Sequence, residues 1–251
     1  MKTMNQHILY ESDCLRKFGT VLFGSTFGTE PDTDYEAKIS DKLADWLGFT
    51  RQFQSKDDLI PAFRELKKCT GHFPTELTPE TTVLYRGTRR HISVIKELKN
   101  LKVQGITALP GKFISGTMTY TSKYPMQSWS VKAVVAHGFA ERGSMGGSWK
   151  VDSVGERFPA PDMIPAVFMS KFSREELLFS SKFIDKFAGK VWGALMQGEG
   201  EIVRISNAPM KAKLFISVDA LKQATDIQKH PDIMKILDDI GLTYRGHGIW
   251  S

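Results

Sequence analysis

The stretch Thr81-Thr82-Val83-Leu84-Tyr85-Arg86 marks the point at which the chain changes character. Its β-branched and aromatic residues predict a strand. We expect later strands over 112–121, 165–172, 198–206 and 213–218, with helices over 91–100 and 131–141 between them. Two short helices close the chain, and the last begins at Pro231 and ends at Gly241. Strands broken by single helices, without regular βαβ alternation, indicate an α+β fold with a mixed β-sheet.

The residues before this stretch predict helices instead. One apolar stripe recurs every four residues, at Tyr35, Ile39, Leu43 and Leu47. A second helix is expected from about residue 58 to residue 70, where Thr70-Gly71 ends it. We therefore expect a helical N-terminal region over 1–78 that packs on a core over 79–251, with helices at the C-terminal end of that core.

The composition is that of a folded protein with a modest positive charge. The chain has 251 residues, of which 41% are hydrophobic, and this is enough to bury a substantial core. The excess of 34 Lys and Arg over 28 Asp and Glu gives a net charge of +6, which attracts anionic partners such as nucleotides, nucleic acids or acidic proteins. The basic residues occur in short scattered groups, so for most of them a solvated surface is the expected setting.

The cysteines and the N-terminus indicate a soluble, cytoplasmic protein. Cys14 and Cys69 are too far apart for a CxxC pair, and no Cys or His grouping has the spacing of zinc ligands. We expect two free thiols in a reducing compartment and no metal. Because the sequence has neither a signal peptide nor an uninterrupted apolar span long enough to cross a bilayer, we expect no contact with a membrane.

The most informative segment for function is Gln197-Gly198-Glu199-Gly200-Glu201-Ile202-Val203-Arg204. On a continuous strand, Glu199 and Glu201 point to the same face about 7 Å apart. Two such carboxylates repel each other, and glycines weaken a strand while letting another molecule approach its backbone. These features indicate a ligand site, although an exposed edge strand with two solvated acids has the same pattern.

Cleavage of an N-glycosidic bond requires a carboxylate of this kind. The transition state resembles an oxocarbenium ion, so a fixed negative group beside the ribose stabilises the developing charge. Glu201 fits this role. Glu199 could orient an incoming acceptor or take a proton from it.

A second candidate segment is Gln127-Ser128-Trp129-Ser130, directly before the predicted helix over 131–141. On an extended backbone Ser128 and Ser130 share one face. Their hydroxyls could then hold a ribose, or hydrogen-bond a catalytic glutamate and orient it. The alternative is that Ser130 is an ordinary helix N-cap.

A third candidate is Tyr85-Arg86-Gly87 at the end of the first strand. A fixed guanidinium can clamp a diphosphate, and the glycine would leave room for it. Alternatively Arg86 is a surface or salt-bridged residue. The same tripeptide recurs as Tyr244-Arg245-Gly246. A further acidic pair, Glu175-Glu176, follows Ser173 as in a capping box and predicts the start of a helical turn.

Taken in chain order, the arginine strand, the Ser-x-Ser segment and the Glu-x-Glu segment resemble the R-S-E class of mono-ADP-ribosyltransferases, which is known from bacterial toxins and phages. The resemblance covers roughly residues 81–218. The family's serine motif is usually Ser-Thr-Ser, and here Trp129 stands in the middle, so Ser128 is the matching residue.

The resemblance implies an ADP-ribosyltransferase core that consumes NAD as a substrate. It implies that Arg86, with Tyr85, Gly87, Ser128 and Ser130, binds NAD. Glu201 is then catalytic, assisted by Ser128 and Glu199. A glutamate at the first position of the pair, as here, is typical of members that modify arginine, and the loop before the pair, here 188–197 with Trp192, usually recognises the target protein.

The implied partner is an acceptor protein in the producing or infected cell, such as a component of a host's transcription or translation machinery. Three alternatives remain open. One is an NAD glycohydrolase, in which water replaces the acceptor. Another is a basic nucleic-acid-binding module without NAD chemistry, using Arg86, Lys102, Arg204 and Lys211 as phosphate contacts. The third is transfer of ADP-ribose to a nucleic acid.

Overall fold

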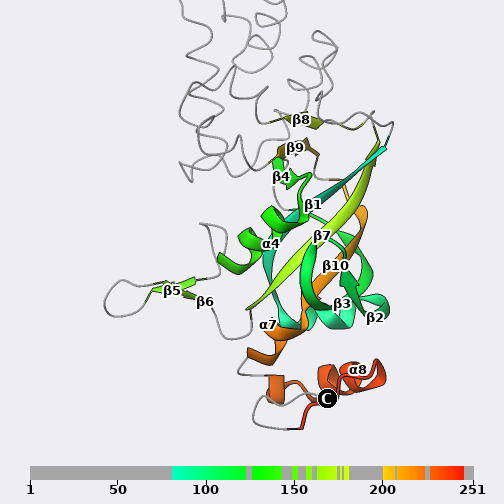
Figure 1. The fold of residues 1–251 in the computed structure, drawn as a ribbon, viewed down its shortest axis with the longest axis vertical. Helices are drawn as coiled ribbons and strands as arrows, with labels where there is room; N and C mark the ends of the chain where they lie inside the picture. The colour runs from blue at the N-terminus through cyan, green and yellow to red at the C-terminus, as the bar shows by residue number, and fades with distance from the viewer. Residues whose placement is uncertain are drawn as a thin grey trace, which may run out of the picture. The chain divides into compact units, whose positions relative to one another are not determined.

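A computed structural model describes residues 81–122, 126–142, 149–151, 157–159, 163–173, 176, 178–180, 200–206, 208–223 and 227–245 (Figure 1). The predicted helical region over 1–78, both cysteines and the expected target-recognition segment 188–197 lie outside these ranges. The chain divides into two compact units. The Arg86 unit contains Val83–Tyr120, Trp129–Lys171 and Pro209–Ser251, and the Glu201 unit contains Thr121–Ser128 and Phe172–Ala208 besides residues up to 82.

The Arg86 unit is built on a β-sheet. The strands that belong wholly or partly to this unit lie side by side in the order β2 (Lys99–Ile106), β3 (Leu109–Tyr120), β10 (Met210–Ser217), β7 (Met163–Ser173), β1 (Thr81–His91) and β4 (Met126–Ser130). The pairs β2–β3, β3–β10, β10–β7 and β1–β4 are antiparallel. The centre of the sheet is therefore a strand from late in the chain, β10, inserted between two earlier ones.

Helix α4 (Ala133–Arg142) covers part of one face of this sheet. Its Ala133, Ala136 and Ala140 are buried and pack in one cluster with Leu109, Phe113, Val167 and Phe215. Alanines on this face of the helix allow its backbone to lie close to the sheet. Arg89 on β1 fixes the end of the helix, since its guanidinium donates to the carbonyl oxygens of Glu141, at 2.9 Å, and Met163, at 3.0 Å.

The C-terminal part of the unit consists of short helices: α7 (Val218–Gln223), the 3-10 helix η3 (Ile227–Lys229) and α8 (Pro231–Asp239). Helix α8 ends in a Schellman motif, in which the N–H of Leu242 donates to Leu237 O and that of Gly241 to Asp238 O, both at 2.9 Å. Gly241 has φ 83°, as this motif requires.

The Glu201 unit contains β8 (Leu178–Ser180) and β9 (Glu201–Ile205), which are antiparallel, with Leu178 opposite Arg204. The other neighbour of β9 is β4. In the Arg86 unit, β5 (Trp149–Val151) and β6 (Arg157–Pro159) form a separate two-stranded ribbon.

The described residues thus have a mixed fold of helices and a large antiparallel sheet. Strands expected over 112–121, 165–172 and 213–218 are confirmed as β3, β7 and β10, and the helix expected over 131–141 is confirmed as α4. The helix expected over 91–100 is largely wrong. Only a 3-10 helix, η2 (Ile92–Glu97), forms there, and the residues from Lys99 onward begin strand β2.

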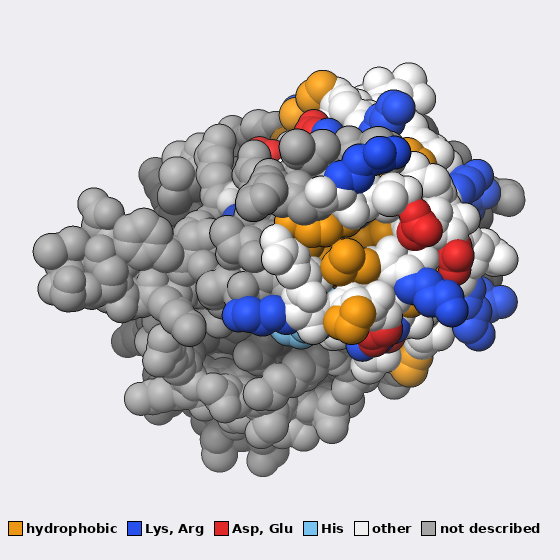
Figure 2. Space-filling model, turned by 90° about the horizontal axis from the view of Figure 1, so that it is seen from below, with side chains coloured by type: hydrophobic (Ala, Val, Ile, Leu, Met, Phe, Trp, Pro, Cys, Tyr) orange, Lys and Arg blue, Asp and Glu red, His pale blue; other side chains and the backbone are white. Residues whose placement is uncertain are grey.

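The surface carries both basic and hydrophobic side chains. Figure 2 shows one face, on which Lys and Arg side chains form several separate groups around an area of hydrophobic side chains. In the part of the chain that the structure describes, no helix combines the length and the apolar character needed to cross a membrane.

Candidate functional site

Ser128 and Glu201, which are 73 residues apart in the chain, are joined by a hydrogen bond in the Glu201 unit. The Ser128 hydroxyl, on β4, donates to Oε1 of Glu201, the first residue of β9. The glutamate side chain is buried, with 7% of the residue exposed, whereas Ser128 is exposed. Burial of a carboxylate is unfavourable unless it is hydrogen-bonded, so the serine stabilises the charged form and fixes its orientation.

The segment before Glu201 departs from the expected strand. Gly200 lies in a turn with φ 58°, and β9 begins only at Glu201. A left-handed residue interrupts an extended strand, so the strand expected over 198–206 is shorter than predicted and begins at Glu201. Residues with a side chain rarely adopt this backbone conformation, so a glycine is favoured at position 200. Glu199 lies outside the described residues.

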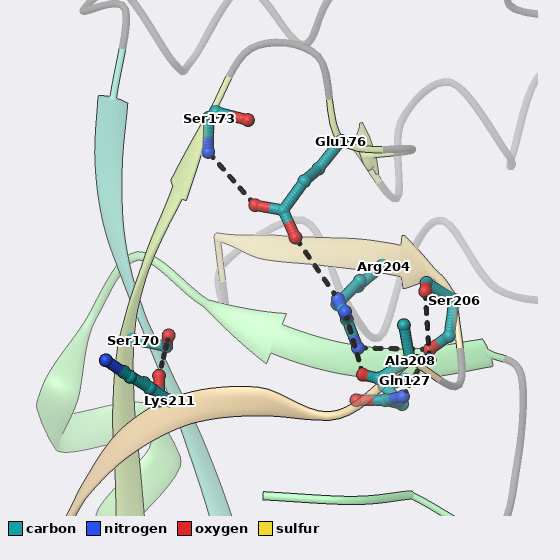
Figure 3. Close-up of polar contacts among 8 residues, drawn as sticks. All are labelled: Gln127, Ser170, Ser173, Glu176, Arg204, Ser206, Ala208 and Lys211. Carbon is teal, nitrogen blue, oxygen red and sulfur yellow. Dashed lines mark hydrogen bonds and ion pairs between the residues drawn. The ribbon is translucent and has the colours of Figure 1, made fainter. Parts of the chain in front are cut away.

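The far end of β9 is held by a buried arginine. Arg204 is 3% exposed, and its guanidinium donates to the carbonyl oxygens of Ser206, at 3.1 Å, and Ala208, at 3.2 Å (Figure 3). Its Nε lies 3.6 Å from Oε1 of Glu176, and its Cζ lies 5.9 Å from the centre of the Phe172 ring. The charge is therefore compensated inside the unit. Arg204 does not fit the nucleic-acid-binding alternative, in which it contacts phosphates.

Glu176 makes two hydrogen bonds with Ser173 that fit the expected capping box. Its carboxylate accepts from the backbone N–H of Ser173 at 3.0 Å, and its own backbone N–H donates to the Ser173 carbonyl oxygen at 3.2 Å, which closes a turn. Ser173 ends strand β7, and Glu176 lies in a bend before β8. The carboxylate also faces Arg204 (Figure 3), so Glu176 supports the β9 region as well, a role that the sequence did not indicate.

The strand that carries Ser128 is fixed relative to β9 by its neighbour. Gln127 is 1% exposed, and its amide nitrogen donates to the Ser206 carbonyl oxygen at 2.6 Å. That oxygen also accepts from Arg204. Because Gln127 precedes Ser128 directly, this contact positions the backbone from which the serine hydroxyl reaches Glu201. Nothing in the sequence distinguishes Gln127 or Ser206 as a supporting residue, because both are common at surfaces.

The other candidates lie in the Arg86 unit. Tyr85 on β1 is the Cα partner of Ser130 on β4, so the arginine strand and the serine strand are hydrogen-bonded neighbours there. Tyr85 packs partly buried against the hydrophobic cluster under α4. Arg86 is half-buried. Ser130 is buried, and its hydroxyl accepts from the backbone N–H of Lys132 at 3.0 Å, one residue before α4 begins. It thus orders the entry into α4, close to the expected capping role.

Gly87 has a packing role. An added Cβ would lie 1.6 Å from the carbonyl oxygen of Ala136 and 2.8 Å from the nitrogen of Ala140, both on α4. The space beside this glycine is thus filled by helix backbone, which corrects the expectation that Gly87 leaves room for a diphosphate.

Within the described ranges, no three His, Cys, Asp or Glu side chains gather where they could hold a metal ion. In comparisons with models of known protein families, with curated proteins and with solved structures, nothing matches this chain.

Proposed function

We propose that this protein is an NAD-dependent mono-ADP-ribosyltransferase that transfers ADP-ribose to a protein side chain and releases nicotinamide. The observation that carries the proposal is the hydrogen bond from Ser128 to the buried Glu201 carboxylate. In the order of motifs described above, these are the serine and the glutamate that the R-S-E resemblance pairs. The contact is what a serine that orients a catalytic glutamate would make.

The role proposed for Glu201 follows from the charge that develops when a bond of NAD breaks. When the glycosidic C–N bond of NAD breaks, its electron pair leaves with nicotinamide and positive charge develops on the ribose. A carboxylate that accepts a hydrogen bond from a ribose hydroxyl stabilises that charge, and it does so more strongly in a site shielded from water. The burial of Glu201 and its fixed orientation both favour this role.

The acceptor completes the reaction. An acceptor nitrogen, which we propose to be that of an arginine guanidinium, forms the new bond to the ribose carbon and loses a proton. Glu199 is the proposed proton acceptor, because a guanidinium is a poor nucleophile until it is partly deprotonated. Arg86 is the proposed contact for the NAD diphosphate, because a guanidinium suits paired phosphate oxygens.

The test uses the full chain, tagged NAD and a cell lysate. We expect the wild type to label proteins, with mass spectrometry locating ADP-ribose on the acceptor side chain. Glu201→Gln should lower the rate of nicotinamide release by about 10²-fold or more, as loss of a charge-stabilising group does. Its amide can still accept from Ser128, so the fold should be preserved.

Glu97→Gln is the matched control, since this exposed glutamate lies in the Arg86 unit at the end of η2. It should label at the wild-type rate. Undiminished labelling by Glu201→Gln would overturn the proposal. Free ADP-ribose without any labelled protein would support the glycohydrolase instead.

A further inference from the structure

Five lysines lie on one face of the sheet in the Arg86 unit. On β10, Lys213 is opposite Thr117 of β3 and Met169 of β7, and Lys211 is opposite Thr119. On β2, Lys99 is opposite Thr117 and Lys102 is opposite Ser115. Directly opposite residues point to the same side of a sheet, as do alternate residues of one strand. Lys171, two residues after Met169, therefore joins the lysine face, which consists of Lys99, Lys102, Lys171, Lys211 and Lys213.

The lysine face carries concentrated positive charge. Lys99, Lys102, Lys171 and Lys211 are exposed and Lys213 is half-buried. Burial lowers the pKa of Lys213, and the nearby charge of Lys102 lowers it further. Among the ion pairs of the described residues, none joins one of these five lysines to a carboxylate. Like charges on adjacent strands destabilise a sheet, and an anionic ligand would relieve that repulsion.

The spacing of the lysines suits a chain of phosphates. Alternate residues of a strand are about 7 Å apart and neighbouring strands about 4.8 Å, so the face extends roughly 14 Å from β2 to β7. Beside the lysines stand Thr117 and Thr119, which are exposed, and Met169, which is half-buried, whereas the ring of Phe215 beside Lys213 is only 3% exposed. A protein partner would normally bind through large exposed apolar or aromatic anchors, and the exposed side chains here are lysines and threonines.

We infer that the lysine face binds the phosphate backbone of a nucleic acid, without reading its sequence. Lysine ammonium groups contact phosphates as point charges and discriminate poorly between bases, which are read through their edges. The face differs from the nucleic-acid-binding site considered from the sequence, because it excludes Arg86 and Arg204 and adds Lys99, Lys171 and Lys213. It requires no NAD chemistry, so it stands or falls separately from the proposed transferase activity.

The experiment measures binding of the full chain, without NAD, to a fluorescent single-stranded oligonucleotide by anisotropy over a range of salt concentrations. Five phosphate contacts predict that log K falls against log salt with a slope of about −3.5, at about −0.7 per contact. The double variant Lys102→Gln, Lys211→Gln should bind more weakly, with a slope shallower by about 1.4. A duplex of the same sequence distinguishes the two forms of nucleic acid, because each contact then contributes about −0.9.

The control variant Lys222→Gln, Lys235→Gln removes the same charge from exposed positions of α7 and α8. It should keep the wild-type slope. Equal slopes for both double variants would overturn the inference, as would the absence of binding at low salt. Preferential binding of polyglutamate, lost in the lysine-face variant, would also overturn it in favour of an acidic protein.

Discussion

Gly87 of β1 lies against the backbone of α4 so closely that a Cβ at this position would be 1.6 Å from the carbonyl oxygen of Ala136. Gly87→Ala should therefore push α4 off the sheet and lower the free energy of unfolding by about 2 kcal/mol, as overpacking does. Urea denaturation measures the change. Gly138→Ala is the control, because an added Cβ in this position of α4 meets nothing within 4 Å. It should be neutral or stabilise the protein by up to about 1 kcal/mol. Equal stability of the two variants would contradict the packing role.

Removal of the Ser128 hydroxyl tests how Glu201 is held. In Ser128→Ala the carboxylate stays buried but loses a donor. Loss of a hydrogen bond to the charged form raises the pKa of the carboxyl group. We expect nicotinamide release to fall about tenfold, because a hydrogen bond to a charged group is worth about 1.5 kcal/mol or more. The acid limb of the pH–rate profile should move to higher pH.

Ser170→Ala is the control for this measurement, since the Ser170 hydroxyl donates to the backbone oxygen of Lys211 at 2.8 Å within the Arg86 unit (Figure 3). The acid limb of the pH–rate profile of Ser170→Ala should match that of the wild type. An unchanged acid limb in Ser128→Ala would mean that the hydroxyl does not act through Glu201.

We expect Arg204 to stabilise the folded protein through its hydrogen bonds to backbone oxygens as well as through its ion pair. Arg204→Met removes the donors to Ser206 O and Ala208 O and the partner of Glu176. Because the Glu176 side chain is still 32% exposed, we expect a loss of only about 2 kcal/mol, less than for a fully buried pair. Denaturant unfolding measures it. Glu176→Gln should cost less than Arg204→Met, and the reverse order would show that the ion pair dominates.

The ion pair of Lys96 with Asp232 should make stability depend on pH. The hydrogen bond from Lys96 lowers the pKa of the Asp232 carboxyl group in the folded protein. A lowered folded pKa stabilises the protein above the unfolded pKa, and this contribution disappears as the pH falls through the folded value. Asp232→Asn should lower Tm slightly near neutral pH, and the difference from the wild type should vanish in acid and shrink with added salt. A difference that persists in acid would exclude the carboxylate as its source.

The sequence predicted the elements of the Arg86 unit better than their pairing. The residue types of β3, β7, β10 and α4 identified these elements, because each of them contains apolar side chains that the fold buries. Strand β2 was missed because register shifts interrupt its pairing with β3, so its apolar residues show no regular alternation, and because it lies at the edge of the sheet order, where the hydrophobic signal is weak. In α8, Ile233 and Leu237 are buried, whereas Ile236 and the C-cap residue Ile240 are half-buried.

The candidate site was only partly predictable. The types of residue in the Ser128 and Glu201 segments suggested the pair, and the hydrogen bond agrees with one of the roles considered for the serine. The supporting contacts could not be predicted, because Gln127 to Ser206 and Glu176 to Arg204 join segments far apart in sequence. The packing role of Gly87 could not be predicted either, since the sequence does not distinguish a glycine approached by a ligand from one approached by a helix.

The carbonyl oxygen of Ser206 accepts from both Gln127 and Arg204. A shift of β4 along β9 by one residue would break the Gln127 contact and turn the serine side chain to the opposite side of the strand. Misaligned pairing of these strands would therefore lose a hydrogen bond of the buried Gln127 side chain. A protein that folds with the wrong register would lose the contact that orients the Glu201 carboxylate, so this orientation depends on strand alignment during folding as well as on the two side chains themselves.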